Sequence, residues 1–223
     1  MSAPVHCVLF DLDGTLVDTA PDLGHAANHV RATLGLPPLP LADYRPVASA
    51  GARGLLHKAL GITPEHPEFD AHRRLFLDRY RAHLADDSRP FDGIAELLAG
   101  IEAQQRRWGV MTNKPAWLTG PLLDALDLAA RACCAVSADE VPRAKPAPDG
   151  LLHAAALAGV AASNCVYVGD DLRDIDAAHA AGMRSIAAAW GYIGDTPVDR
   201  WGADRVVESP DALLHWLAGQ PRG

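Results

Sequence analysis

Two patterns of apolar residues alternate along the chain. Short apolar runs are typical of buried strands, and they lie at 6–10, 107–112, 132–136, 164–169, 184–189 and 204–208. Longer stretches, in which apolar residues recur every three or four positions, predict helices at 93–105, 116–127, 148–159, 172–182 and 210–218. Strands that alternate with helices favour a parallel sheet covered on both faces. The sequence therefore predicts an α/β fold with a Rossmann-like parallel sheet as its core.

One long segment breaks this alternation. From residue 20 to about 88 only helical spacing is found, with helices expected at 20–36, 52–61 and 67–85. The third of these carries an apolar stripe typical of packing against a core. We therefore expect a small all-helical cap domain at 19–88, inserted into an α/β catalytic core made of 1–18 and 89–223.

Composition narrows the classes of partner. The 223 residues carry a net charge of −8, which argues against a basic nucleic-acid-binding face. No apolar run approaches the ~18 residues of a membrane span, and the N-terminus has no charged leader, so a cytoplasmic protein is expected. The four cysteines lack the spacing of a zinc site and are predicted to be buried free thiols; they are Cys7, Cys133, Cys134 and Cys165.

The first predicted strand ends in clustered negative charge. In the stretch VLFDLDGTLVDT, apolar residues lead directly into Asp11, and Asp13 follows two positions later. Like charges held close together repel, and each is costly to remove from water, so the pair needs a compensating partner. In an extended backbone the two side chains point to the same side, and Gly14 permits a tight turn after them.

Polar residues also follow other predicted strands. Thr112 and Asn113 lie at the end of the second, Asp170 follows the fourth, and Lys145 lies in a loop just before a helix. Ligands of open α/β sheets bind beyond the carboxyl ends of the strands, so we expect these side chains on one rim with Asp11. Carboxylates at 11 and 170 can share a divalent cation. Mg²⁺ fits them because it takes few protein oxygens and keeps waters for a phosphate.

This set of residues predicts phosphoryl transfer. A carboxylate beside a metal ion and a phosphate suggests covalent catalysis, with Asp11 as the nucleophile that forms an aspartyl phosphate. The leaving alcohol must be protonated and the attacking water deprotonated, and Asp13 can carry out both transfers. Thr112 and Lys145 can hold phosphate oxygens that the metal does not reach. Each motif alone is weak, but four motifs in order, each at a predicted strand end or in the nearby loop, favour a functional site.

With these motifs the chain resembles the haloacid dehalogenase superfamily. DLDGTLVDT matches its first motif, TN its second, KP at 145–146 its third and GDDLRD its fourth, and the helical insertion looks like the family's small cap. The resemblance implies that Asp11 is nucleophile and magnesium ligand, that Asp13 also ligates magnesium through its backbone carbonyl, and that Asp170 completes the set. It also implies that Asp171 and Asp174 do not bind the ion directly and that one of them orients a metal-bound water.

The residues leave alternative activities to compare. A phosphatase transfers the phosphoryl group to water, whereas a phosphotransferase or sugar phosphomutase passes it to a second hydroxyl with the same core residues. A dehalogenase is disfavoured because such enzymes typically lack an aspartate at the position of Asp13. A phospho-receiver domain also clusters Asp, Thr and Lys around magnesium, but it has no cap and is phosphorylated at a middle strand. We therefore expect a phosphoric monoester hydrolase.

Finer similarity narrows the substrate. The segments SAGARGLL, FLDRY, SRPFDG and WGVMTNKP resemble phosphoglycolate phosphatase-like enzymes and, among these, the N-acetylmuramic acid 6-phosphate phosphatases of peptidoglycan recycling. This implies a small, carboxylate-bearing phosphorylated metabolite, with phosphoglycolate as the alternative. In the cap segment 47–56, Arg53 can pair with a carboxylate, and the start of a helix there favours an anion. The sequence leaves the substrate and the oligomeric state open.

Overall fold

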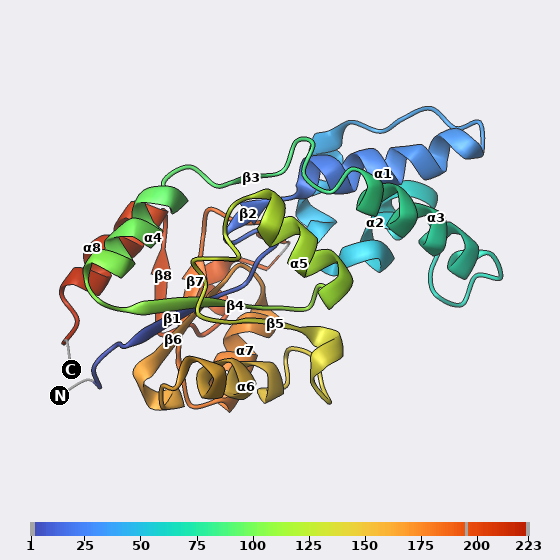
Figure 1. The fold of residues 1–223 in the computed structure, drawn as a ribbon. Helices are drawn as coiled ribbons and strands as arrows, with labels where there is room; N and C mark the ends of the chain where they lie inside the picture. The colour runs from blue at the N-terminus through green and yellow to red at the C-terminus, as the bar shows by residue number, and fades with distance from the viewer. Residues whose placement is uncertain (1–2, 195, 222–223) are drawn as a thin grey trace.

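The predicted parallel sheet is confirmed. The computed structural model describes residues 3–194 and 196–221; residues 1–2 and 222–223, at the ends of the expected core, lie outside this range, as does 195. Neighbouring strands are all parallel, in the order β5-β4-β1-β6-β7-β8, so that β1 lies inside the sheet (Figure 1). The strands are β1 (Cys7–Phe10), β4 (Arg107–Thr112), β5 (Ala135–Ser137), β6 (Cys165–Gly169), β7 (Arg184–Ala188) and β8 (Arg205–Val207).

Alternating side chains give the sheet two separate cores. In β1, Val8 and Phe10 belong to one apolar cluster, and Cys7 and Leu9 belong to the other, as the two-residue period of a strand requires. Helices α4 and α8 lie on one side of the sheet and α6 and α7 on the other (Figure 1). These helices are α4 (Ile94–Ala103), α5 (Ala116–Ala125), α6 (Asp149–Ala158), α7 (Leu172–Ala180) and α8 (Pro210–Ala218), with short 3-10 helices at Ala138–Glu140, Ala162–Asn164 and Val198–Arg200.

The helical insertion lies beside the carboxyl end of the sheet, as Figure 1 shows. Its apolar stripe is confirmed as core packing: Phe69, Phe76, Tyr80 and Leu84 are buried in the cluster that also holds the sheet residue Phe10. The insertion contains α1 (Ala20–Thr33), α2 (Gly51–Leu60) and α3 (Phe69–Ala82), with 3-10 helices at Leu41–Asp43 and Arg45–Ala50.

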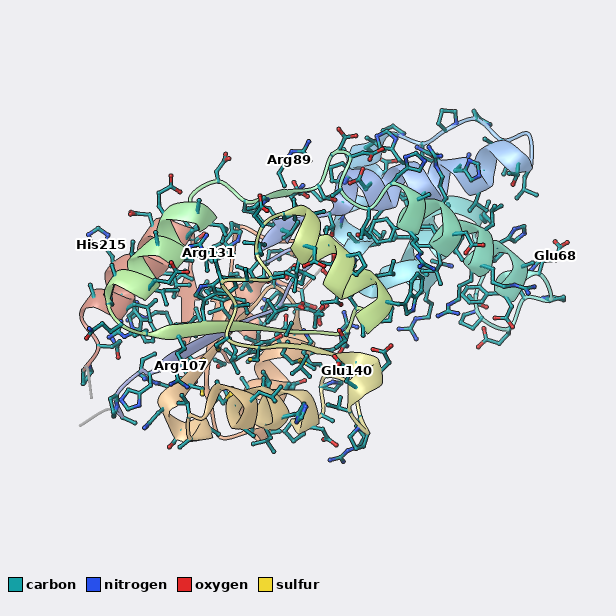
Figure 2. All side chains as sticks on the ribbon, in the orientation of Figure 1. Glu68, Arg89, Arg107, Arg131, Glu140 and His215 are labelled. Carbon is teal, nitrogen blue, oxygen red and sulfur yellow. The ribbon has the colours of Figure 1, made fainter. Side chains whose placement is uncertain are left out.

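Two very short strands pair with each other at the point where the chain enters and leaves the helical insertion. β2 (Val17–Asp18) and β3 (Arg89–Pro90) pair in antiparallel fashion, and Arg89 projects beside this crossing in Figure 2. The buried carboxylate of Asp22 in α1 reinforces the crossing, because it accepts hydrogen bonds from the backbone N–H and the hydroxyl of Ser88 at 2.8 and 2.7 Å. Two-residue strands are too short for a period-2 pattern to predict.

The prediction that all four cysteines are buried is wrong for Cys133 and holds only in part for Cys134. Cys7 and Cys165 are buried in adjacent strands, but Cys133 is exposed and Cys134 is half-buried. The expected strand 132–136 instead begins at Ala135, so Cys133 lies in the turn before an edge strand.

Among the described residues, no helix combines the length and the apolar character that a membrane span requires.

Candidate active site

Three adjacent strands deliver three polar side chains to one rim. Asp11 follows β1, Asp170 follows β6, and Thr112 is the last residue of β4. The Asp11 backbone N–H donates to the Val168 carbonyl at 2.9 Å, which extends the β1–β6 register up to the site. All three side chains are buried. The structure therefore brings together the groups that the sequence places at strand ends.

Negative charge is concentrated at this rim. One oxygen each of Asp11, Asp170 and Asp174 lies within 4.8 Å of the others, and all three residues are buried. Burial, with the charges of Asp11 and Asp174, raises the pKa of Asp170 well above its usual range. Burial also raises the pKa of Asp174 to about 6, although Lys145 acts against the shift. Converging carboxylate oxygens that repel one another fit a hard divalent cation such as Mg²⁺.

Lys145 supplies the positive charge inside this cluster. Its ammonium lies 3.0 Å from Asp11 Oδ1 and 2.7 Å from Asp174 Oδ1, and it donates to the Tyr167 hydroxyl at 2.8 Å. Burial alone would lower the pKa of Lys145, but the charges of Asp11 and Asp174 outweigh it and the net shift is upward. Lys145 therefore remains an ammonium and is ready to hold an anion beside Asp11.

Asn113 positions this lysine. Its side-chain amide donates to the Lys145 carbonyl at 3.1 Å and accepts from the Lys145 backbone N–H at 3.0 Å. The two bonds tie the loop that carries Lys145 to the end of β4. Asn113, expected to bind substrate, also lines the cavity described below, but both ends of its amide are engaged by protein.

Asp13 has its own cation, which the sequence analysis did not assign. Lys114 Nζ lies 2.9 and 3.1 Å from the two carboxylate oxygens of Asp13, and Thr19 donates its hydroxyl to Oδ1 at 2.7 Å. The signal was present, because Lys114 directly follows the TN motif. A lysine beside a motif gives no indication of which carboxylate it faces, since Asp13 is 101 positions away.

The turn after Asp13 requires glycine. Gly14 has φ = +87°, in the left-handed region that favours glycine. A Cβ at this position would lie 2.2 Å from an oxygen of Asp170. Gly14 therefore allows the chain to turn directly against the carboxylate cluster.

Asp171 faces an arginine. Asp171 caps α7, and its two carboxylate oxygens accept from Arg173 Nε and Nη2, each at 2.8 Å. Burial acts to raise the pKa of Asp171, but Arg173 outweighs it and the net shift is downward. Arg173 Nη2 also donates to the backbone carbonyl of Ser49 at 2.8 Å. Asp171 therefore orients an arginine that reaches the helical insertion.

Ser49 makes a second contact between the insertion and the rim. Its hydroxyl donates to Asp170 Oδ2 at 3.2 Å. The same carboxylate accepts from the Thr15 hydroxyl at 2.7 Å and from the Tyr192 backbone N–H at 2.9 Å. The segment just before α2 is thus held against the carboxylate cluster.

A cavity of about 350 Å³ lies between the rim and the helical insertion. Asp11, Asp13, Thr112 and Lys145 line it from the sheet side. The insertion contributes an apolar wall and a polar one: the first contains Leu23, Phe76 and Leu77, and the second contains Ser49, Arg53 and Arg73. Arg53 is exposed at this wall, as is Arg73, which sequence reasoning missed because it lies on a different helix.

Comparison with known proteins identifies the family. The protein-family model that describes haloacid dehalogenase-like hydrolases matches residues 8–188 of this sequence. An N-acetylmuramic acid 6-phosphate phosphatase from Pseudomonas aeruginosa is 45% identical over 212 residues, covering 94% of this chain and 93% of that protein. A phosphoglycolate phosphatase from Xanthomonas campestris pv. campestris is 45% identical over 210 residues, covering 92% and 93%. The crystal structure of a predicted phosphoglycolate phosphatase from Haemophilus somnus 129pt matches with a TM-score of 0.84 at 26% identity, covering 95% of this chain and 97% of that one.

The chain therefore belongs to the haloacid dehalogenase-like hydrolases, and the expected family is confirmed. Its relatives are phosphatases, and the chain is a phosphoric monoester hydrolase.

The Arg173 contact gives a testable prediction. Replacing Arg173 with glutamine removes the guanidinium that donates to the Ser49 carbonyl. A hydrogen bond to a charged group contributes about 1.5–3 kcal/mol, and partial exposure reduces this, so we expect kcat/KM for phosphate release to fall about 10-fold. Arg131→Gln is the matched control, because Arg131 pairs with Glu102 on the core, away from the insertion (Figure 2). Equal values for the two variants would show that Arg173 does not support the cavity.

Proposed function

We propose that the chain is a magnesium-dependent phosphomonoesterase that acts through an aspartyl phosphate at Asp11. The observation that carries the proposal is the position of Asp11, whose buried carboxylate lies 3.0 Å from Lys145 Nζ and lines the cavity. We further propose that residues 1–18 and 89–223 form the catalytic core and that 19–88 form the cap, with the β2–β3 crossing as the hinge.

The carboxylate cluster supports the assignment of magnesium. Asp11, Asp170 and the backbone carbonyl of Asp13 would hold the ion. The oxygens of Asp174 are engaged by Lys145 and by the Asp171 N–H, which favours an indirect role for Asp174, and Asp171 is occupied by Arg173. When bound, Mg²⁺ offsets the charge of the cluster and of the phosphate that approaches it.

The residues of this chain then divide the work. Lys145 and the Thr112 hydroxyl bind phosphate oxygens, while Asp11 Oδ attacks phosphorus and the bond to the leaving oxygen breaks. Asp13 gives a proton to that oxygen and later takes one from the water that releases phosphate. The insertion covers the site and excludes bulk water, which strengthens each electrostatic contact.

A sugar phosphate with a carboxylate is the substrate class that the cavity supports best. A volume of about 350 Å³ is within the range of pockets that enclose ligands much larger than phosphoglycolate. Its wall combines apolar surface with Arg53, which can pair with a carboxylate. Together with the similarity to the Pseudomonas aeruginosa enzyme, this favours N-acetylmuramic acid 6-phosphate. Phosphoglycolate is the second candidate, because the Xanthomonas phosphatase is equally similar.

The direct test is phosphate release from a panel of substrates in the presence of Mg²⁺. The panel contains N-acetylmuramic acid 6-phosphate, N-acetylglucosamine 6-phosphate, phosphoglycolate and a hexose phosphate. We expect the highest kcat/KM for the muramic compound, with free phosphate appearing without an acceptor sugar. Preference for phosphoglycolate would overturn the substrate assignment, and transfer that depends on an acceptor would indicate a mutase.

Asp11→Asn is expected to abolish turnover, because an amide cannot form the aspartyl phosphate. The rate should fall by more than 100-fold, well beyond the loss of a single positioning contact. Asp176→Asn is a suitable control, since Asp176 lies on α7 near the site but is exposed. Phosphate release is measured for each variant, with folding checked by circular dichroism. A variant that keeps more than about a hundredth of the wild-type rate would refute covalent catalysis at Asp11.

Arg53 is expected to read the substrate carboxylate. In Arg53→Ala, kcat/KM for N-acetylmuramic acid 6-phosphate should fall about 10-fold or more, the magnitude of one charge-assisted contact. The value for N-acetylglucosamine 6-phosphate, which lacks the lactyl acid, should change little. Comparing the two sugars within one variant removes general effects on the fold. Equal losses on both would show that Arg53 does not contact the carboxylate.

A further inference from the structure

Lys114 is a buried cation that contacts both Asp13 and a residue of the helical insertion. Its side chain is 5% exposed, and its ammonium faces both carboxylate oxygens of Asp13, whose side chain is 17% exposed. Exposed ion pairs contribute little because water screens them, but this pair is largely shielded. Breaking a buried pair on one side leaves an uncompensated charge. The Asp13 carboxylate is therefore held firmly in place by Lys114.

The third partner of Lys114 comes from the helical insertion. Lys114 Nζ donates to the Tyr80 hydroxyl at 2.9 Å, and it lies 4.5 Å from the centre of the Tyr80 ring. Tyr80 is a buried residue of α3. Burial raises the pKa of Tyr80 to about 12, so its hydroxyl stays neutral. The chain of contacts thus runs from α3 through Tyr80 and Lys114 to Asp13.

Asp13 also accepts a hydrogen bond from a residue next to the β2–β3 crossing. Thr19, the residue that precedes α1, donates its hydroxyl to Asp13 Oδ1 at 2.7 Å. Asp13 therefore contacts a core lysine and a residue at the start of the insertion, while Lys114 contacts Tyr80 in α3. The insertion therefore contacts this carboxylate directly through Thr19 and indirectly through Tyr80 and Lys114.

We propose that Lys114 is a positioning residue for proton transfer. It orients the Asp13 carboxyl group, first as the acid that gives the proton and then as the carboxylate left behind, and through Tyr80 it makes that orientation depend on the helical insertion. The inference rests on the proposed role of Asp13 as the proton donor to the leaving oxygen. Lys114 itself needs no contact with the substrate. Its effect should therefore appear only where that proton is needed.

The leaving group distinguishes positioning from a structural role. An alkyl alkoxide leaves poorly without a proton, whereas p-nitrophenolate leaves readily as an anion. General acid catalysis contributes roughly 10²–10⁴-fold. In Lys114→Met we expect kcat/KM for the best alkyl phosphate of the panel to fall at least 30-fold, and that for p-nitrophenyl phosphate to fall less than 3-fold. Because kcat/KM reports the steps up to departure of the leaving group, slow release of phosphate does not mask the difference.

Further variants keep the experiment interpretable. Tyr80→Phe removes only the hydroxyl and should give the same selective loss in weaker form, while Tyr44→Phe, at another buried tyrosine of the insertion, should not. Lys114→Arg, which retains the charge, should recover part of the alkyl phosphate activity. Lys58→Met, at an exposed lysine paired with Asp43, controls for loss of a positive charge. Melting temperatures identify any variant whose fold is lost.

A double-mutant cycle with Asp13→Asn decides the outcome. If Lys114 acts through Asp13, Lys114→Met should cause no further loss of alkyl phosphate activity in the Asp13→Asn background. Additive losses, or equal losses on both leaving groups in Lys114→Met and Tyr80→Phe, would overturn the positioning role. If Asp13→Asn loses the same kcat/KM on alkyl phosphate as on p-nitrophenyl phosphate, the proposed role of Asp13 is itself wrong. This outcome distinguishes failure of the proposed function from failure of the positioning role of Lys114.

Discussion

The active site depends on burying three carboxylates close together. Asp11 and Asp170 follow adjacent strands and Asp174 lies in α7, and their buried oxygens converge where their charges repel. Lys145 offsets part of this charge, while burial and the charges of Asp11 and Asp174 raise the pKa of Asp170. A hard divalent cation such as Mg²⁺ would offset the repulsion between the converging oxygens. The carboxylate cluster therefore supports the magnesium site of the proposed function.

Two other aspartates of the motifs, Asp13 and Asp171, each have their own cation, and both of these cations contact the helical insertion. Lys114 joins Asp13 to Tyr80 of α3, and Arg173 joins Asp171 to the carbonyl of Ser49. Ser49 also donates to Asp170. The charged side chains at the rim thus also contact the insertion that lies over the cavity.

The sequence predicts much of this architecture because the relevant signals are local. Apolar runs and helical spacing predict the sheet and the inserted helices. Four short motifs, at strand ends or in a nearby loop, predict that Asp11, Thr112, Lys145 and Asp170 lie close together. Contacts between distant segments leave no such signal: Arg173 and Ser49 are 124 positions apart. The β2–β3 crossing is too short to show a period, and Cys133 lies in a turn because β5 starts later than its apolar run suggests.

The most direct test of this account is the effect of Mg²⁺ on thermal stability at constant ionic strength. An ion that binds only the folded protein stabilises it by mass action. The account predicts that Mg²⁺ raises the melting temperature of the wild-type protein and of Asp176→Asn, an exposed-site control. Asp170→Asn should melt at a higher temperature than the wild type without Mg²⁺, because repulsion is relieved, and should gain nothing when Mg²⁺ is added. An Asp170→Asn variant stabilised by Mg²⁺ as much as the wild type would contradict the account.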